Sequence, residues 1–274
     1  MSENVTVIRP SRRWVSLGLR ELWDYRELLY FLVWRDLKGR YRQMALGPLW
    51  LVIRPMVTLL IFTFVFGSVA RIPSEGLPYP LFAFAALVPW QFFSSSTSGS
   101  ANSLVSHLGV ISKVYFPRLV LPMAVVIAGL IEMAVSLLAF TGLMLWYRVY
   151  PTANVFVLPV YVIMAAATSL ATGLWLASLS VRFRDVSFAV GYLMQAWLFL
   201  SPVIYPSGLV PHGWRWLYSL NPMVPVIEGF RWCLLDTGRV PASSHLIAGS
   251  LVMVALVVGA LVFRRTDQTV VDLL

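Results

Sequence analysis

The sequence carries little charge for its length. Of its 274 residues only 12% are Asp, Glu, Lys or Arg, while 59% are hydrophobic; a soluble domain has about 25% charged residues. The charges gather in short clusters between long apolar stretches, and no polar stretch is long enough to form a soluble domain. Because only helices or closed barrels can cross a bilayer, and each helix needs about 20 mostly apolar residues, this pattern predicts an all-α polytopic membrane protein.

Several kinds of chemistry have no residues to support them. The single cysteine, Cys233, excludes an intrachain disulfide and a cysteine metal cluster. The three histidines lie far apart without metal-ligand spacing. Neither a G-x-x-x-x-G-K-[ST] phosphate loop nor an H-E-x-x-H or G-x-S-x-G motif occurs. We therefore expect no metal site, no nucleotide hydrolysis and no enzyme activity in this chain.

The net charge of +9 would indicate a nucleic-acid partner in a soluble protein. Here the basic residues sit in short loops, so we interpret them as topology signals and expect no nucleic acid partner. With six membrane spans, fifteen Lys and Arg residues fall inside and five outside, which predicts cytoplasmic termini. The spans are expected at Gly47 to about Val69, Pro80 to about Ser100, about Leu119 to Trp146, Val155 to about Val181, about Val186 to Ile204 and about Leu246 to Phe263.

Two regions follow from this layout. Residues 1–46 are predicted to form a cytoplasmic tail and an amphipathic helix, and residues 47–274 a six-helix transmembrane domain. In the helix, Leu19 to Arg42, the apolar centre is too short to span a bilayer, and its aromatics and flanking charges favour a position in the membrane interface. The alternative is an ordinary solvated helix packed on a partner.

A proline-rich stretch, Pro206 to Val240, separates the fifth and sixth spans. Its two apolar pieces, Trp214 to Leu220 and Met223 to Leu235, are each too short to cross the membrane. Broken helices at membrane depth are tolerated where they are buried in protein or line a cavity. We predict a re-entrant pair of half-helices at about 208–235 in the outer leaflet, with Pro211 and Pro222 near their N-terminal ends.

Polar residues within the spans have two interpretations each. Arg54 either extends back to the cytoplasmic interface or lies near the inner mouth of a pathway for an anionic substrate. Glu132, near the middle of the third span, is either a structural hydrogen-bonding or protonated acid or takes part in a conformational change. The serines from Ser94 to Ser100 favour close helix packing over substrate contact.

Aromatic residues concentrate toward the outer side. The membrane-interface belt explains many of them, but a subset could line a conduit, because aromatic faces stack on the apolar faces of sugars. A conduit alone moves nothing uphill, so active export would need a separate motor. The candidates for such a path and its outer gate are Trp90, Phe93, Tyr205, Trp214, Trp216, Tyr218 and Trp232.

Four stretches carry a resemblance to a known family. They are WRDLKGRYRQMALGPLW (Trp34 to Trp50), ISKVYFPR (Ile111 to Arg118), SPVIYP (Ser201 to Pro206) and NPMVPVIEGFR (Asn221 to Arg231). With them the chain resembles, over almost its whole length, the membrane subunit of bacterial ABC transporters that export polysaccharides. These include O-antigen and teichoic acid permeases and, more distantly, capsule permeases.

The resemblance implies a homodimer in the bacterial inner membrane with two soluble ATPase subunits, which would bind the ATP and magnesium. Its substrate would be a glycan on an undecaprenyl diphosphate-type carrier, with Leu19 to Val33 near the entrance and 208–232 as the periplasmic gate. The basic rim would meet the diphosphate through Arg35, Lys38, Arg40, Arg42 and Arg54. The cytoplasmic coupling segment that touches the ATPase would include Ile111, Lys113, Tyr115, Phe116 and Arg118.

Three rival functions stay open at this point. One is a permease of the same architecture for a small hydrophobic compound. Another is a membrane transferase acting on lipid-linked sugars, and the last is a passive channel that works without an ATPase. The motifs do not identify the glycan.

Overall fold

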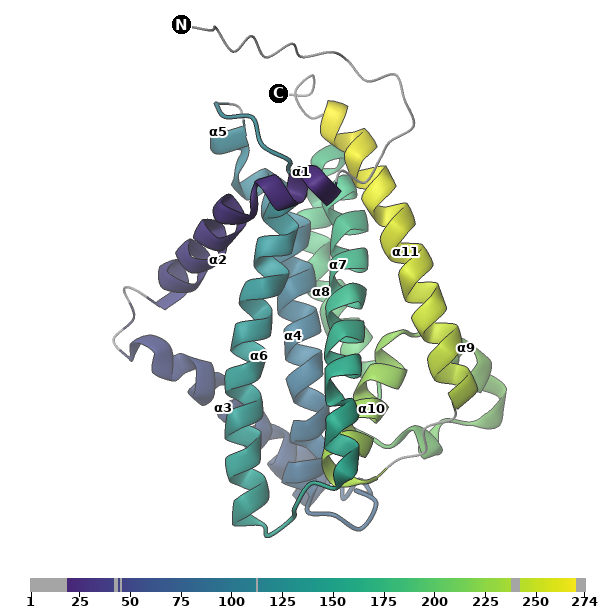
Figure 1. Cartoon of the computed structure of the whole chain (residues 1–274). Helices are drawn as coiled ribbons and strands as arrows, with labels where there is room; N and C mark the ends of the chain where they lie inside the picture. Colours follow the sequence, from purple (N-terminus) through teal and green to yellow (C-terminus); the bar gives the residue numbers. More distant parts are fainter. Residues whose placement is uncertain (1–18, 42–43, 45, 112, 238–241, 270–274) are drawn as a thin grey trace, which may run out of the picture.

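The computed structural model describes residues 19–41, 44, 46–111, 113–237 and 242–269, and this part of the chain is helical with no strand. The helix Tyr79–Ser106 (α4) lies in the middle of the bundle (Figure 1). The α-helices are α1 (Leu19–Asp24), α2 (Arg26–Tyr41), α3 (Trp50–Phe62), α4 (Tyr79–Ser106), α5 (Leu108–Ile111), α6 (Val120–Trp146), α7 (Leu158–Arg182), α8 (Arg184–Phe199), α9 (Arg215–Ser219), α10 (Met223–Leu235) and α11 (Ala242–Thr269). Short 3-10 turns precede α3, α7 and α9, and a π-helical segment, Thr63–Val69, continues α3.

Helix α4 forms the centre of the bundle, because α6, α7 and α10 all pack on it. Small residues allow these helices to approach closely. A Cβ on Gly173 of α7 would lie 2.5 Å from Cβ of Ser100, and one on Gly129 of α6 would overlap Oγ of Ser96. Ser96 and Ser100 are buried in these contacts, so part of the serine-rich stretch serves helix packing as predicted.

Four segments of the described chain are long and apolar enough to cross a membrane: Gly47–Val69, Val120–Trp146, Ala153–Arg182 and Ile247–Thr266. They coincide with four of the six predicted spans. The second predicted span is α4, which is long enough but interrupted by Gln91 and serines; the fifth is α8, whose 16 residues fall short of a 30 Å core at 1.5 Å per residue. Six crossings therefore stay a prediction.

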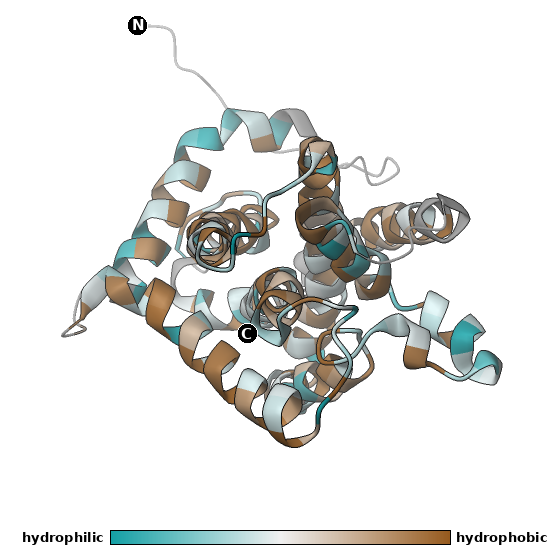
Figure 2. Cartoon of the chain, turned by 90° about the horizontal axis from the view of Figure 1, so that it is seen from below, coloured by the Kyte–Doolittle hydropathy of each residue, from teal (hydrophilic) through white to brown (hydrophobic). Residues whose placement is uncertain are grey.

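The outer surface of the bundle is apolar, as expected of a protein surrounded by lipid. Large side chains such as Leu60, Leu138 and Ile163 are each more than two-thirds exposed. Viewed along the bundle, hydrophobic residues occupy outward sides of the helices as well as the contacts between them (Figure 2). In a soluble protein such large exposed apolar surface would be an aggregation hazard, so the chain is a polytopic membrane protein.

Both ends of the described chain lie at the same end of the bundle. Helix α1 and the C-terminal end of α11 meet there, beside α5 (Figure 1). Arg264 Nη2 donates to Glu21 Oε2 at 3.1 Å and holds the two helices together. This arrangement is consistent with an even number of crossings.

Helices α1 and α2 cover this end of the bundle. Leu22, Tyr25, Leu29 and Leu32, from the predicted apolar face, pack into a cluster with α5, α6, α7 and α11. The opposite face is not purely polar, because it also exposes aromatic residues: Trp23, Tyr30, Phe31 and Trp34. Aromatic residues of this kind are typical of membrane interfaces.

The stretch after α8 is broken into short pieces, as the prolines predicted. Pro211 and Pro222 stand at the N-terminal caps of a 3-10 turn and of α10, and α9 has only 5 residues. Helix α10 is mostly buried against α4 and α7, whereas α9 lies at the periphery. Neither helix is long enough to cross a bilayer.

Candidate functional site

A polar cavity of about 490 Å³ lies between α3, α4 and α6. Helical spacing explains its composition. Gln91, Ser94, Ser95 and Ser98 follow at i, i+3, i+4 and i+7, so one face of α4 lines the cavity with amide and hydroxyl groups. Ser96, Thr97 and Ser100 point to the neighbouring helices instead. The serine-rich stretch therefore contributes both to helix packing, as predicted, and to one wall of the cavity.

Two opposite charges line the same cavity, Arg54 from α3 and Glu132 from α6. Arg40, near the end of α2, donates from Nη1 to Glu132 Oε1 at 2.8 Å. A carboxylate at membrane depth is costly unless it is paired, and Arg40 supplies that pairing. The structure thus brings together two of the predicted diphosphate contacts, Arg40 and Arg54, around an acid whose role the sequence left open.

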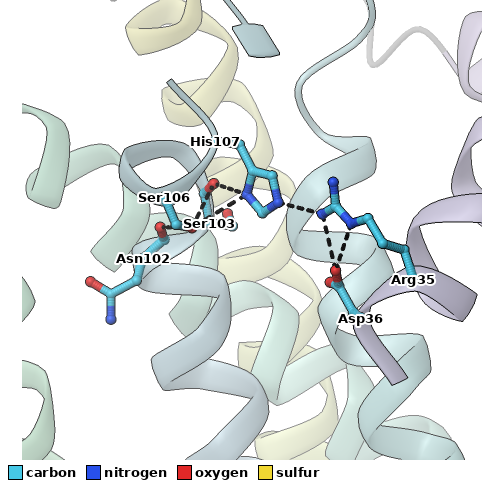
Figure 3. Close-up of polar contacts among 6 residues, drawn as sticks. All are labelled: Arg35, Asp36, Asn102, Ser103, Ser106 and His107. Atoms are coloured by element: carbon cyan, nitrogen blue, oxygen red, sulfur yellow. Dashed lines mark hydrogen bonds and ion pairs between the residues drawn. The ribbon is translucent and has the colours of Figure 1, made fainter. Parts of the chain in front are cut away.

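Arg35 does not line this cavity; its guanidinium points toward His107 at the end of α4 (Figure 3). It bonds Asp36 Oδ1 at 3.0 Å and reaches Nε2 of His107. Because an arginine only donates, Nε2 must accept, and Nδ1–H of His107 then donates to the Ser103 carbonyl at 2.8 Å. This network joins α2 to the turn between α4 and α5. Sequence reasoning missed it, since a histidine without metal-ligand spacing gives no signal of such a contact.

The remaining basic candidates lie elsewhere. The ammonium of Lys38 sits 5.1 Å from the centroid of the Trp34 ring, a cation–π contact on the outer side of α2. Arg42 lies outside the described residues. Within the described part of the chain, no three His, Cys, Asp or Glu residues are grouped so that they could hold a metal ion.

The predicted coupling segment divides into buried and exposed residues. Ile111 and Phe116 are buried in the cluster that also contains Leu32 of α2. Lys113 and Tyr115 are exposed at the same end of the bundle, and Arg118 is partly buried. The Tyr115 hydroxyl donates to Glu21 Oε1 at 3.4 Å, and Glu21 also holds Arg264. This segment therefore contacts α1, α2 and the end of α11.

An apolar groove of about 820 Å³ lies at the other end, between the last turns of α8 and the broken segment. Of the predicted path residues, Tyr205, Trp214 and Tyr218 line it. Trp214 is 63% exposed, so its ring is accessible.

The other aromatic candidates are not brought into this groove. Phe93 is fully buried, with its ring edge-on to Trp197 at 5.1 Å between centroids. Trp90 is nearly buried but borders the polar cavity. Trp216 is 66% exposed on α9, and Trp232 packs partly buried against the core. The seven aromatics therefore do not form one continuous surface in this chain.

Comparison with known proteins identifies the family. The family model described as "ABC-2 type transporter" matches residues 27–235. The chain is 35% identical over 241 residues to an O-antigen export system permease protein RfbA of Myxococcus xanthus, covering 87% of this chain and 91% of that protein. An RfbA of Klebsiella pneumoniae is 27% identical, covering 75% and 79%. The polysialic acid transport protein KpsM of Escherichia coli is 24% identical, covering 85% and 91%.

Proposed function

The chain belongs to the ABC-2 type transporter family and is an ABC permease of the polysaccharide-export kind, and from that premise we propose its specific task. It exports a lipid-linked polysaccharide, an O-antigen-type glycan on undecaprenyl diphosphate, from the cytoplasm to the periplasm. Two copies form the channel in the bacterial inner membrane, with all termini cytoplasmic. Two soluble ATPase subunits supply the energy, so the chain itself needs no cofactor.

The observation that carries this proposal is the polar cavity. A diphosphate needs cationic and hydrogen-bonding partners in a site screened from bulk water, and arginine is suited to phosphate because it can donate two parallel hydrogen bonds. Arg54 lines the cavity, Arg40 is bound to Glu132 on its wall, and α4 contributes hydroxyl groups to the lining. The basic residues Arg35, Lys38 and Arg42 would attract the headgroup toward the entrance. The apolar groove at Trp214 supports a glycan path at the opposite end.

The proposed path makes a prediction at two neighbouring tryptophans. Trp214→Ala is expected to lower export about two- to tenfold, because it removes an aromatic face that contributes about 0.5–1.5 kcal/mol when stacked. Trp216→Ala is the matched control, since Trp216 is equally exposed but lies outside the groove. Surface glycan per folded permease measures the effect. Equal export by both variants would remove the groove from the path.

A second prediction concerns the ATPase contact. Tyr115→Ala is expected to weaken association with the ATPase subunit roughly tenfold or more, because exposed aromatics are often the dominant anchors of interfaces. Tyr150→Ala, which removes an exposed tyrosine beyond the far end of α6, serves as control. Co-purification of the ATPase with tagged permease is the measurement. Undiminished co-purification of the Tyr115 variant would contradict the assignment.

The decisive test is reconstitution of the permease with its ATPase in vesicles. Hydrolysis stimulated by a lipid-linked glycan, together with transfer of that glycan across the bilayer, would support the proposal. Stimulation by small hydrophobic compounds alone would favour the drug-type permease instead, and turnover of a sugar donor without the ATPase would favour a transferase. A capsule or teichoic acid glycan is the second candidate substrate, since one relative is named for polysialic acid transport.

A further inference from the structure

Arg40 already has an anionic partner inside the protein. Its Nη1 lies 2.8 Å from Glu132 Oε1, and the two side chains are 35% and 20% exposed. The pair is therefore neither sealed in the core nor fully solvated. Glu132 lines the same cavity as Arg54, and its contact with Arg40 ties the end of α2 to the middle of α6.

A carboxylate and a phosphate present similar oxygens to a guanidinium, so the two compete for the same donors. We propose that Glu132 occupies the place at Arg40 that a lipid-borne diphosphate takes, and that the headgroup displaces Glu132 when substrate is loaded. This inference rests on the proposed function, since it assumes a diphosphate-linked substrate. Glu132 then acts as a built-in competitor that sets how readily the cavity is occupied.

The surroundings of the pair suit such an exchange. The diphosphate carries more charge and more acceptor oxygens than one carboxylate, and Arg54, which lines the same cavity, provides a further cation. Ser94, Ser98 and Gln91 of α4 line the same cavity as Glu132, and their hydroxyl and amide groups are of the kind that can donate to a displaced carboxylate. Neither anion is left without donors at any stage of the exchange.

Displacement also changes how α2 is held. Helix α2 has a second polar anchor, from Arg35 to His107, about one and a half turns before Arg40 and away from the cavity. Loss of the Arg40–Glu132 contact removes one polar anchor from the end of α2, while the Arg35 anchor and the buried Leu32 keep the middle of the helix in place. Phe116 of the coupling segment packs in the same cluster as Leu32, so the part of α2 beside the coupling segment stays in place while its cavity end changes.

The test compares binding by the wild type and Glu132→Gln in the full transporter with its ATPase. A single environment-sensitive fluorophore is placed at Gly39→Cys on α2, where a side chain meets no neighbour within 4 Å; Cys233 is fully buried and is not expected to react. Phosphatidylcholine vesicles containing undecaprenyl diphosphate are titrated, and vesicles with phosphatidylglycerol in its place show whether any anionic lipid suffices. Glu27→Gln is the matched control, because it removes the same kind of carboxylate from an exposed position in the first turn of α2, away from the cavity.

Glu132→Gln is expected to reach half-saturation at roughly tenfold lower undecaprenyl diphosphate, within the range of typical coupling between sites, while Glu27→Gln matches the wild type. Glu132→Asp keeps the charge but increases the distance to Arg40, so its half-saturating concentration is expected to fall by less than that of Glu132→Gln. This variant replaces Glu132→Gln in the test if the glutamine variant does not fold. An unchanged or higher half-saturation point for both Glu132 variants overturns the inference and leaves the proposed function intact. No response of the wild type to the diphosphate lipid, or an equal response to phosphatidylglycerol, overturns the proposed substrate and the inference with it.

Discussion

Replacing Gly229 with leucine is expected to prevent α10 from docking and to abolish most export. A Cβ at this position would overlap the ring of Tyr161 on α7, and Tyr161 is itself buried. Overpacking a dense core costs about 1–3 kcal/mol for a small insertion, and leucine adds three carbons beyond the first. Because α10 is the buried helix of the broken segment, its displacement would also disturb the groove at Trp214.

Gly229→Ala provides the graded version of this experiment. Alanine gains up to about 1 kcal/mol over glycine within a helix, so only the clash with Tyr161 can make it destabilising. Gly142→Ala in α6 is the control. No atom lies within 4 Å of the Cβ that alanine would add there, so only the gain in helix propensity changes stability. In thermal unfolding in detergent, the melting temperature of Gly142→Ala should equal or exceed that of the wild type. The melting temperatures of both Gly229 variants should be lower than that of the wild type. Rescue of Gly229→Ala by Tyr161→Ala would identify the clash as the cause.

Arg231→Ala is expected to destabilise the protein by about 3–5 kcal/mol. The Arg231 side chain is 2% exposed, and its guanidinium donates to the carbonyls of Val203 at 3.1 Å and Phe82 at 3.3 Å. It also stacks 3.6 Å from the centroid of the Phe82 ring. Alanine would leave a cavity and deprive the Val203 carbonyl of its donor, which separates α10 from α4 and from the turn after α8.

Two further substitutions locate the source of this effect. Arg231→Lys keeps the charge but cannot span both carbonyls with a planar fork, so its stability should be intermediate. Arg215→Ala in the neighbouring α9 removes an exposed arginine that donates to the Val210 carbonyl, and should change stability by about 0.5 kcal/mol or less. The same unfolding measurement serves all three. A wild-type melting temperature for Arg231→Ala would refute the role of this residue as an anchor.

Helix positions were largely predictable because they depend on local composition. The stretch Gly47–Val69 and the helix Met223–Leu235 have the predicted bounds. The prolines at 211 and 222 cap the pieces that they were expected to begin. Local rules suffice here, because proline has no backbone N–H for the helix interior and is therefore favoured at helix starts. In the same way, an apolar run needs about 20 residues to span a bilayer, whatever its neighbours.

Side-chain partners were not predictable, because they join residues distant in the sequence. Arg231 is one of the five basic residues that the sequence analysis counted outside the membrane, and the structure buries it in the core. Phe93 was predicted to line the path and is buried beside Trp197. The basic stretch 35–42 looked uniform, yet the turn of α2 sends Arg35 to His107 and Arg40 to Glu132.

The sequence by itself determined that this chain is a helical membrane permease with an interrupted segment before its last helix, because hydrophobic length, prolines and the family motifs are all local properties. Only the tertiary structure decided which charges neutralise one another and which line a cavity. That choice depends on how the helices pack around α4, where glycines and serines allow close approach. The periodicity of a single helix carries no information about which neighbour a side chain will meet.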